Sequence, residues 1–307
     1  MSEPAPQIAS LLTEQISPRY VELDAWPTCE ILAAMYEGQL AAVAAVGPAL
    51  GAISAAVEDA ARVLGGEGRL VYVGAGTSGR IGVQDGTELT PTFDWPAERL
   101  VFLMAGGLDA LAHSVEGAED NEDDGARAIR EAKIDASDVV IGIAASGTTP
   151  YTVGALRAAR EAGAVTIAVA SNPNAPLLRA ARHRILVETG EEVIAGSTRM
   201  KAGTAHKIVL NLLSSALMVR LGRVYRGLMV HMRATNAKLR RRAEAILREL
   251  SGCDDTKATQ CVEAADGNVK LALMLAFGLE RDRAVQSLEK HGGNLRLAIA
   301  EVPIRDG

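Results

Sequence analysis

The sequence predicts an α/β fold in which helices cover both faces of a five-stranded, mainly parallel sheet, followed by a small helical domain. Five short apolar runs alternate with helical segments between residues 69 and 188. The runs are nearly continuous in apolar residues, which is typical of strands buried on both faces. Glycine- and serine-rich loops follow the first and third runs, and the C-terminal part contains an internal repeat.

The order of the elements follows from the apolar pattern. Before the sheet, residues 24–64 carry apolar residues at helical spacing. Within them, 40–57 predicts a buried helix rather than a membrane span, because acidic residues bound it. After the second strand we expect an amphipathic helix through Val115, and further helices at 150–162, 196–221 and 235–250. The predicted strands are 69–74, 99–105, 138–145, 165–170 and 183–188.

Composition limits the classes of function. The chain has 307 residues, 30 glycines, three cysteines and a net charge of −6. The cysteines lack CxxC spacing and the five histidines are scattered, so the sequence supports neither a disulfide framework nor a metal site. The acidic excess argues against nucleic acid as a partner. The N-terminus lacks the features of a signal peptide, and we expect a cytoplasmic protein that does not bind a membrane.

The C-terminal repeat has an offset of 26 residues. Each copy carries a Gly-Asn pair between two helical segments, and the Asn is suited to cap the second of them. The sequence therefore predicts two helical hairpins. The first copy is Ala258, Gln260, Glu263, Gly267, Asn268, Leu271 and Ala272, and the second is Ala284, Gln286, Glu289, Gly293, Asn294, Leu297 and Ala298.

Two hydroxyl-rich loops predict a phosphate site. Gly74-Ala-Gly76-Thr-Ser-Gly79 has the GxGxxG spacing of a dinucleotide site, but the second strand does not end in the acidic residue that would hold a ribose. Thr77 and Ser78 add hydroxyl donors instead. After the third strand, Ser146-Gly-Thr-Thr149 precedes Pro150, a residue suited to a first helical turn. Two such loops at helix N-termini can hold one phosphate ester without a metal.

These motifs, in this order, resemble those of the N-acetylmuramic acid 6-phosphate etherase family, and the likeness runs from about residue 17 to 300. The most specific motif begins at Glu192 and continues into Lys207 and Asn211. The other matching segments are Val71–Gly82, Pro91–Phe93, Ala105–Gly107, Val115–Asp120, Gly142–Gly147, Thr149–Tyr151, Leu228–Val230 and Ala234–Asn236.

The resemblance implies a sugar-isomerase-type (SIS) three-layer αβα domain and a ubiquitin-associated-like helical domain. The expected divisions are 1–50 as an N-terminal helical segment, 51–222 as the SIS domain, 223–250 as a connecting helix and 251–303 as the terminal domain. It implies cleavage of the D-lactyl ether of N-acetylmuramic acid 6-phosphate by water, in the recycling of peptidoglycan amino sugars. It also implies a homodimer with no cofactor.

Two glutamates match the catalytic positions of the family. The resemblance implies that Glu88 protonates the departing lactate oxygen and that Glu119 removes the C2 proton. The residues alone do not select Glu119, because it begins an acidic run that is also typical of a solvated face. Ser197, Thr198 and Lys201 open the helix after the fifth strand and are suited to hold an anion, or to cap that helix. The expected substrate-binding residues are Gly76, Thr77, Ser78, Ser146, Gly147, Thr148, Thr149, Ser197, Thr198 and Lys201.

The chain departs from the family pattern at a few positions. Thr148 stands where the family more often has Arg, His206 where it has Gln and His231 where it has Asp. Thr148 can still donate a hydroxyl hydrogen bond, but not a charge-assisted one. Two other functions remain open at this point, a phosphosugar isomerase and a non-catalytic sugar-phosphate sensor. The joint presence of Glu88 and Glu119 favours an enzyme over a sensor.

Overall fold

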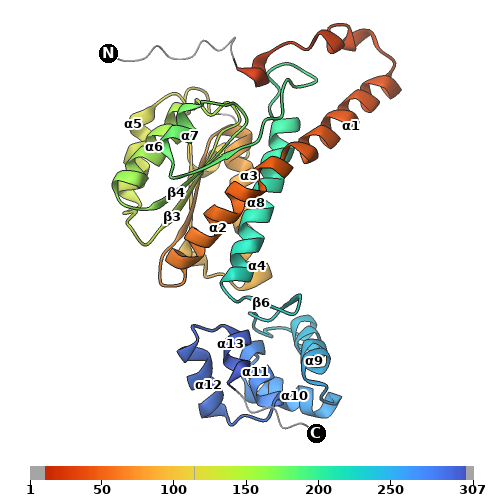
Figure 1. The fold of residues 1–307 in the computed structure, drawn as a ribbon, viewed down its shortest axis with the longest axis vertical. Helices are drawn as coiled ribbons and strands as arrows, with labels where there is room; N and C mark the ends of the chain where they lie inside the picture. The colour runs from red at the N-terminus through yellow and green to blue at the C-terminus, as the bar shows by residue number, and fades with distance from the viewer. Residues whose placement is uncertain (1–10, 114, 302–307) are drawn as a thin grey trace. The chain divides into compact units, whose positions relative to one another are not determined.

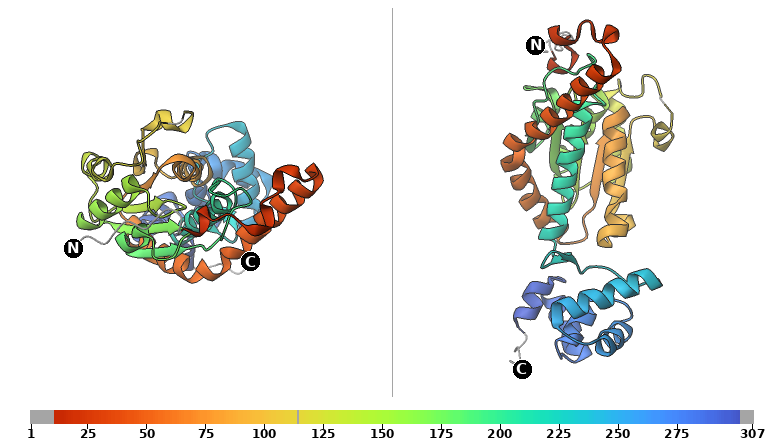
Figure 2. Two further views of the ribbon diagram at one scale, coloured as in Figure 1. Left: turned by 90° about the horizontal axis from the view of Figure 1, so that it is seen from above. Right: turned by 90° about the vertical axis from the view of Figure 1, so that its right-hand side faces the viewer.

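The computed structural model describes residues 11–113 and 115–301, which fall into two compact units. The first unit comprises Met1–Thr87 and Ala97–Ser214, and the second comprises Glu88–Pro96 and Ser215–Gly307. Figure 1 labels the α-helices and some of the strands, and Figure 2 shows the ribbon from two further sides.

A parallel sheet of five strands forms the centre of the first unit, as predicted. The strand order is β2-β1-β3-β4-β5, so the chain runs outward from β1 in one direction to β2 and in the other to β3. The crevice outside the carboxyl ends of β1 and β3 is therefore the topological switch point, where such sheets bind ligands. The strands are β1 (Leu70–Gly74), β2 (Leu100–Met104), β3 (Val139–Ile143), β4 (Val165–Ala170) and β5 (His183–Leu186).

Helices cover both faces of this sheet, which gives the predicted three layers (Figure 1). Helices α5 (Glu122–Glu131), α6 (Pro150–Glu161) and α7 (Pro176–Ala180) pack on one face. Their buried Ile129, Leu156 and Leu177 share one core with valines of β1 and β3. The other face carries α2 (Leu50–Leu64), α3 (Gly76–Thr87) and α8 (Lys201–Arg220).

The predicted helix after the second strand is wrong. In the described part of this segment, 105–113 and 115–121, the helical structure is limited to a short 3₁₀ turn, η7 (Leu108–Leu111). Gly106, Gly107 and Gly117 have positive φ angles of 80°, 75° and 72°, so the backbone turns repeatedly instead of continuing as a helix. Helix α5 begins only at Glu122, where the side chain of Asn121 accepts from two backbone N–H groups. Glu119 therefore precedes a helix rather than following one.

The apolar stretch at 40–57 is not uniformly buried. A 3₁₀ turn, η5 (Gly47–Ala49), separates α1 (Thr28–Ala45) from α2. Ile53 and Val57 of α2 are buried, whereas Leu40, Val43 and Leu50 are 53%, 54% and 52% exposed. Among the described residues, 28–64 and 201–220 are long and apolar enough to span a membrane. That observation is weak, because core helices of soluble proteins have the same length and composition.

The second unit contains the two predicted helical hairpins. In the first, α10 (Asp255–Ala264) precedes α11 (Val269–Ala276), and in the second, α12 (Arg281–Lys290) precedes α13 (Leu295–Ala300). The side chains of Asn268 and Asn294 accept from the N–H groups of Leu271 and Leu297, which confirms the predicted caps. The other elements are α4 (Leu89–Phe93), β6 (Val224–Tyr225), β7 (Leu228–Met229) and α9 (Ala237–Ser251).

Candidate active site

The first predicted phosphate loop joins β1 to α3 at the switch point. Gly74 ends the strand and Gly76 begins the helix with a φ of +51°. A Cβ atom on Gly74 would lie 2.9 Å from the backbone of Gly79, so only glycine permits this approach of helix to strand. Thr77 and Ser78 lie half-buried in the first helical turn, where backbone N–H groups and the helix dipole favour an anion.

The second loop joins β3 to α6 beside the first. Gly147 has a φ of +68°, and a Cβ atom there would lie 2.4 Å from that of Ala175. The Ser146 hydroxyl accepts from the Thr148 N–H (3.1 Å) and from the Thr148 hydroxyl (3.0 Å). Thr149 is the residue before α6, and Pro150 is the first residue of that helix, as predicted. The hydroxyls of this loop are thus oriented by each other at a helix N-terminus.

The segment before α8 is organised by a buried carboxylate. Glu192 is fully buried and accepts from the N–H groups of Lys201 and Ala202, both at 2.9 Å. The Lys201 ammonium donates to the Thr189 carbonyl at 2.8 Å and keeps two further donors. Glu192 already accepts from two N–H groups of α8, so these groups cannot bind an anion. The donors that remain for an anion are the hydroxyls of Ser197 and Thr198 and the other two N–H groups of the Lys201 ammonium.

The first loop and the start of α8 are adjacent. A Cβ atom on Gly203, in the first turn of α8, would lie 3.7 Å from Cγ2 of Thr77. Figure 1 shows α3 and α8 side by side. Ser197, Thr198 and Lys201 immediately precede or begin this turn, so the structure brings them to the loop that contains Thr77.

Two residues that carry no sequence motif hold these segments together. The Asn172 amide donates to the Ala145 carbonyl and to the Thr13 hydroxyl, both at 3.1 Å. The Thr13 carbonyl in turn accepts from the Gly196 N–H at 3.1 Å. Thr13 and Asn172 are both buried. No local pattern could identify them, because their partners lie up to 183 positions away in the sequence.

Glu119 lies at a pocket formed by the first loop. The pocket has a volume of about 290 Å³, and its lining includes Ala75, Gly76, Arg80, Glu116 and Glu119. The Glu119 carbonyl accepts from the Tyr151 N–H at 3.0 Å, which joins the Glu119 segment to the first turn of α6. The side chain itself is exposed. Glu119 therefore shares a cavity with the start of α3 and is fixed by backbone to the second loop.

Glu88 directly follows α3 and is grouped with the second unit, whereas the other predicted site residues lie in the first. It is exposed, precedes α4 and makes no side-chain capping bond. The segment after it is held by Arg223, which donates to the carbonyls of Phe93 and Asp94, both at 2.7 Å. The Arg223 guanidinium also lies 4.8 Å from the ring centre of the buried Trp95.

A buried polar cluster lies under the site. The Tyr72 hydroxyl donates to Asp85 of α3 at 3.0 Å, and Lys207 of α8 lies 3.6 Å from the same carboxylate. Burial raises the pKa of Asp85, and burial together with Asp85 raises the pKa of Tyr72 well above its usual value. Among the described residues, no group of three or more His, Cys, Asp or Glu side chains could hold a metal.

Two family models match parts of the first unit. Residues 52–160 match the family model for the glucokinase regulatory protein N-terminal SIS domain, and residues 122–216 match the SIS domain model. A solved phosphoheptose isomerase from Francisella tularensis is 15% identical, with a TM-score of 0.47 over 63% of this chain and 100% of that chain.

Two curated relatives extend over almost the whole chain. An N-acetylmuramic acid 6-phosphate etherase from Deinococcus radiodurans is 52% identical over 94% of this chain and 95% of its own length. One from Mycolicibacterium smegmatis is 46% identical over 95% of this chain and 98% of its own length. With this identity over this length, the chain belongs to the N-acetylmuramic acid 6-phosphate etherase family.

Proposed function

We propose that this protein cleaves the D-lactyl ether of N-acetylmuramic acid 6-phosphate with water, giving N-acetylglucosamine 6-phosphate and D-lactate. The observation that carries the proposal is the identity of about half of all residues with an etherase over nearly the full chain. The paired hydroxyl loops at the switch point support a phosphosugar ligand. The reaction belongs to the recycling of amino sugars from peptidoglycan, and we place it in the cytoplasm.

The phosphate ester is held at the N-termini of α3 and α6. Thr77, Ser78, Ser146, Thr148 and Thr149 supply hydroxyl groups, and Gly76 and Gly147 allow the backbone to approach the ligand. The helix dipoles add stabilisation, so the binding of this group requires no metal or organic cofactor. Ser197, Thr198 and Lys201 hold the lactate carboxylate or share the phosphate.

The reaction proceeds by elimination followed by hydration. Ring opening places an aldehyde at C1, which makes the C2 proton acidic. Glu119, at the pocket beside Gly76, removes that proton. Glu88 protonates the ether oxygen so that lactate departs as the neutral hydroxyl form rather than as an alkoxide. Water then adds at C3 of the unsaturated aldehyde: the Glu88 carboxylate takes a proton from the water, and Glu119 returns its proton to C2.

Loss of Glu88 should abolish lactate release without unfolding the protein. Glu88→Gln removes the acid, and general acid catalysis typically contributes about 10²–10⁴-fold in rate. Glu98→Gln is a matched control, because Glu98 is also exposed and lies ten residues further along the chain. D-lactate is measured with the purified proteins and the substrate. A rate for Glu88→Gln that equals the control rate would remove Glu88 from the mechanism.

Loss of Glu119 should block the first proton transfer. Because elimination begins at C2, Glu119→Gln is expected to stop exchange of the C2 proton in heavy water as well as lactate release. Glu116→Gln is the matched control, since Glu116 lines the same pocket. The exchange is followed by NMR of the recovered sugar phosphate. Exchange that persists in Glu119→Gln but stops in Glu116→Gln would transfer the role of base to Glu116.

The organisation of the whole chain is part of the same proposal. We assign residues 51–222 to an SIS domain, 1–50 to an N-terminal helical segment and 251–303 to a ubiquitin-associated-like domain, of which 1–10 and 302–303 lie outside the described residues. The connection at 223–250 is not the single helix that the sequence predicts, because the antiparallel strands β6 and β7 precede α9, which begins only at Ala237. The two capped hairpins support the last assignment. The protein acts as a homodimer, which the exposed apolar side chains of α1 support.

A further inference from the structure

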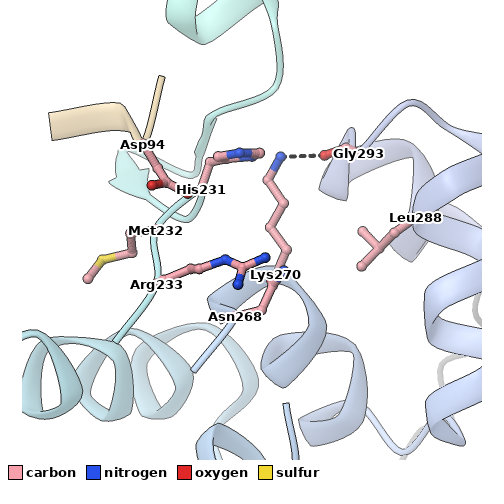
Figure 3. Close-up of a pocket in the computed structure, with 8 residues that line it drawn as sticks. All are labelled: Asp94, His231, Met232, Arg233, Asn268, Lys270, Leu288 and Gly293. Atoms are coloured by element: carbon pink, nitrogen blue, oxygen red, sulfur yellow. Dashed lines mark hydrogen bonds between the residues drawn. The ribbon is translucent and has the colours of Figure 1, made fainter. Parts of the chain in front are cut away.

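The second unit contains a pocket whose charge is not balanced. The pocket has a volume of about 240 Å³ and is lined by none of the residues placed in the catalytic mechanism. Segment 231–233 forms one wall, the start of α11 forms the floor, and Leu288 and Gly293 of the second hairpin form the other wall (Figure 3). A backbone bridge between Arg233 and Asn268 fixes the first wall to the floor.

Lys270 is the buried cation of this pocket. Its side chain rises from the first turn of α11, and the residue is only 5% exposed. The ammonium donates to the Gly293 carbonyl at 2.5 Å, which uses one of its three donors. Among the described residues, no carboxylate forms an ion pair with it. A buried ammonium is stabilised when its remaining donors and its charge are satisfied.

His231 faces this ammonium. Figure 3 shows the imidazole pointing toward the end of the Lys270 side chain, with Asp94 on the other side of the ring. Nδ1 of His231 is buried and has no hydrogen-bond partner in the part of the chain described. Leaving such a group unpaired costs free energy, so a partner that enters the pocket would be favoured there. Asn268 adds a donor, since its oxygen accepts from the Leu271 N–H and its amino group is left for the pocket.

The charges around the pocket are predominantly positive. Arg233 stands at the mouth, and Arg223 is close enough to affect both titrating groups. Burial and Arg223 lower the pKa of Lys270 to about 7. Burial, Lys270, Arg223 and Arg233 lower the pKa of His231 to about 3. Among the described residues that line the pocket, Asp94 is the acidic one. An anion between Lys270 and His231 would relieve this repulsion and give the orphaned Nδ1 a partner.

We propose that this pocket of the second unit binds a phosphate group, held by the Lys270 ammonium, the His231 imidazole, the Asn268 amide and Arg233. The group is that of inorganic phosphate or of a phosphomonoester. Its recognition follows from three nitrogen donors around one cavity and a guanidinium at its mouth. The site is additional to the hydroxyl loops of the first unit and holds its ligand through cations rather than hydroxyl groups.

The test is calorimetric titration of the full chain with inorganic phosphate at constant ionic strength. The double variant Thr77→Ala/Ser78→Ala weakens the phosphate loop of the first unit, so binding that persists in it reports on the second unit. On that background, Lys270→Met is expected to weaken phosphate binding at least about tenfold, because a charge-assisted bond is lost. Lys257→Met is the matched control, since Lys257 is exposed on α10. Equal binding by the two Lys→Met variants would overturn the proposal.

Two further measurements keep the test decisive if Lys270→Met folds poorly. Arg233→Gln changes an exposed side chain and should weaken phosphate binding by a smaller factor. In the unchanged protein, phosphate should shift the imidazole NMR signal of His231 but not that of His183, which is bonded to Asp59 and does not line the pocket beside the first phosphate loop. If the His231 signal does not shift, the proposal is contradicted. Titration of the Thr77→Ala/Ser78→Ala variant with glucose 6-phosphate separates the sources, counting only the binding that Lys270→Met removes: tighter binding than inorganic phosphate assigns a phosphomonoester, and weaker binding assigns the free ion. Neither result depends on lactate release.

Discussion

His206 is a neutral histidine inside the first unit. It is fully buried on α8, and its Nε2 lies 3.0 Å from the hydroxyl of Ser171 at the end of β4. Burial lowers its pKa to about 4. The folded protein therefore holds fewer protons at this residue than the unfolded chain does over the range from about 6.5 down to about 4. The stability that depends on neutral His206 is full above this range and is lost as the pH falls through it.

Replacing His206 with Gln should remove this acid sensitivity. The amide does not titrate and can still bond to Ser171. Between about pH 7 and about pH 5, the free energy of unfolding should fall by about 2 kcal/mol less in His206→Gln than in the unchanged protein. Urea denaturation at the two pH values measures the difference. The pKa of His231 is also lowered, but His231 is present in both proteins, so its contribution to the pH dependence cancels in the difference. Parallel losses in the two proteins would show that His206 is not the sensitive group.

Single residues of the site differ in how well the sequence predicts them. Gly74, Gly76 and Gly79 lie within one loop, so their spacing is visible locally, and the structure confirms the close approach that they allow. Thr13 binds Asn172, which lies 159 positions away, so its role depends on the tertiary fold and leaves no local pattern. Glu192 begins the most specific family motif, but the motif does not indicate that its buried carboxylate accepts from the N–H groups of Lys201 and Ala202. Glu119 is intermediate, because only the family motif distinguishes it from Glu116 and Glu122.

Helices α5 and α6 are packed through two glycines. A Cβ atom on Gly125 would lie 1.9 Å from the Tyr151 carbonyl oxygen, and one on Gly154 would lie 2.1 Å from that of Glu122. Both obstacles are backbone atoms, which cannot rotate away. This contact positions the site, since Glu119 lies just before α5 and the second hydroxyl loop lies just before α6.

Gly154→Ala should therefore destabilise the protein and weaken substrate binding. Forcing a methyl group into this contact is expected to lower the free energy of unfolding by about 1–3 kcal/mol. The KM should rise, because Thr149 immediately precedes α6 and the N–H group of Tyr151 in α6 holds the Glu119 carbonyl. Gly51→Ala is the control: it is exposed within α2 with open space around it, and should stabilise the helix by up to about 1 kcal/mol. Urea denaturation and steady-state kinetics measure both effects, and equal stability of the two variants would contradict the packing argument.

The strands were more predictable than the helices around them. The central strands β1, β3 and β4 are short apolar runs that are buried throughout, as burial on both faces requires. The edge strands β2 and β5 are only partly buried, and β5 begins with His183 and Arg184. The segment after β2 contains apolar residues at helical spacing, but its glycines adopt positive φ and favour turns. The prediction of a buried helix at 40–57 is also wrong for Leu40 and Val43 of α1, which are exposed. An apolar composition indicates that a surface is covered, but it does not say whether the covering comes from the same chain.

For the whole molecule, α1 therefore raises the question of a partner. Leu32, Tyr36, Leu40 and Val43 recur at helical spacing and are 61%, 65%, 53% and 54% exposed. Side chains at such spacing form one stripe on the helix. Contiguous apolar surface of this kind typically marks an interface, and the predicted homodimer provides an identical stripe on the second chain. A two-fold axis would bring the two α1 helices together and cover both stripes at once.

Breaking this stripe should produce a monomer. Leu32→Glu combined with Leu40→Glu places two carboxylates in the centre of the stripe, and burying them without partners costs free energy only in the dimer. Light scattering after size exclusion should give about twice the chain mass of 32.2 kDa for the unchanged protein and the mass of one chain for the variant. Leu108→Glu is the control, because Leu108 is 63% exposed but lies on the 3₁₀ turn after β2. A variant that keeps the larger mass would place the dimer contact on another surface. If the unchanged protein has the mass of one chain, the dimer is removed from the proposal and the stripe is left without a partner.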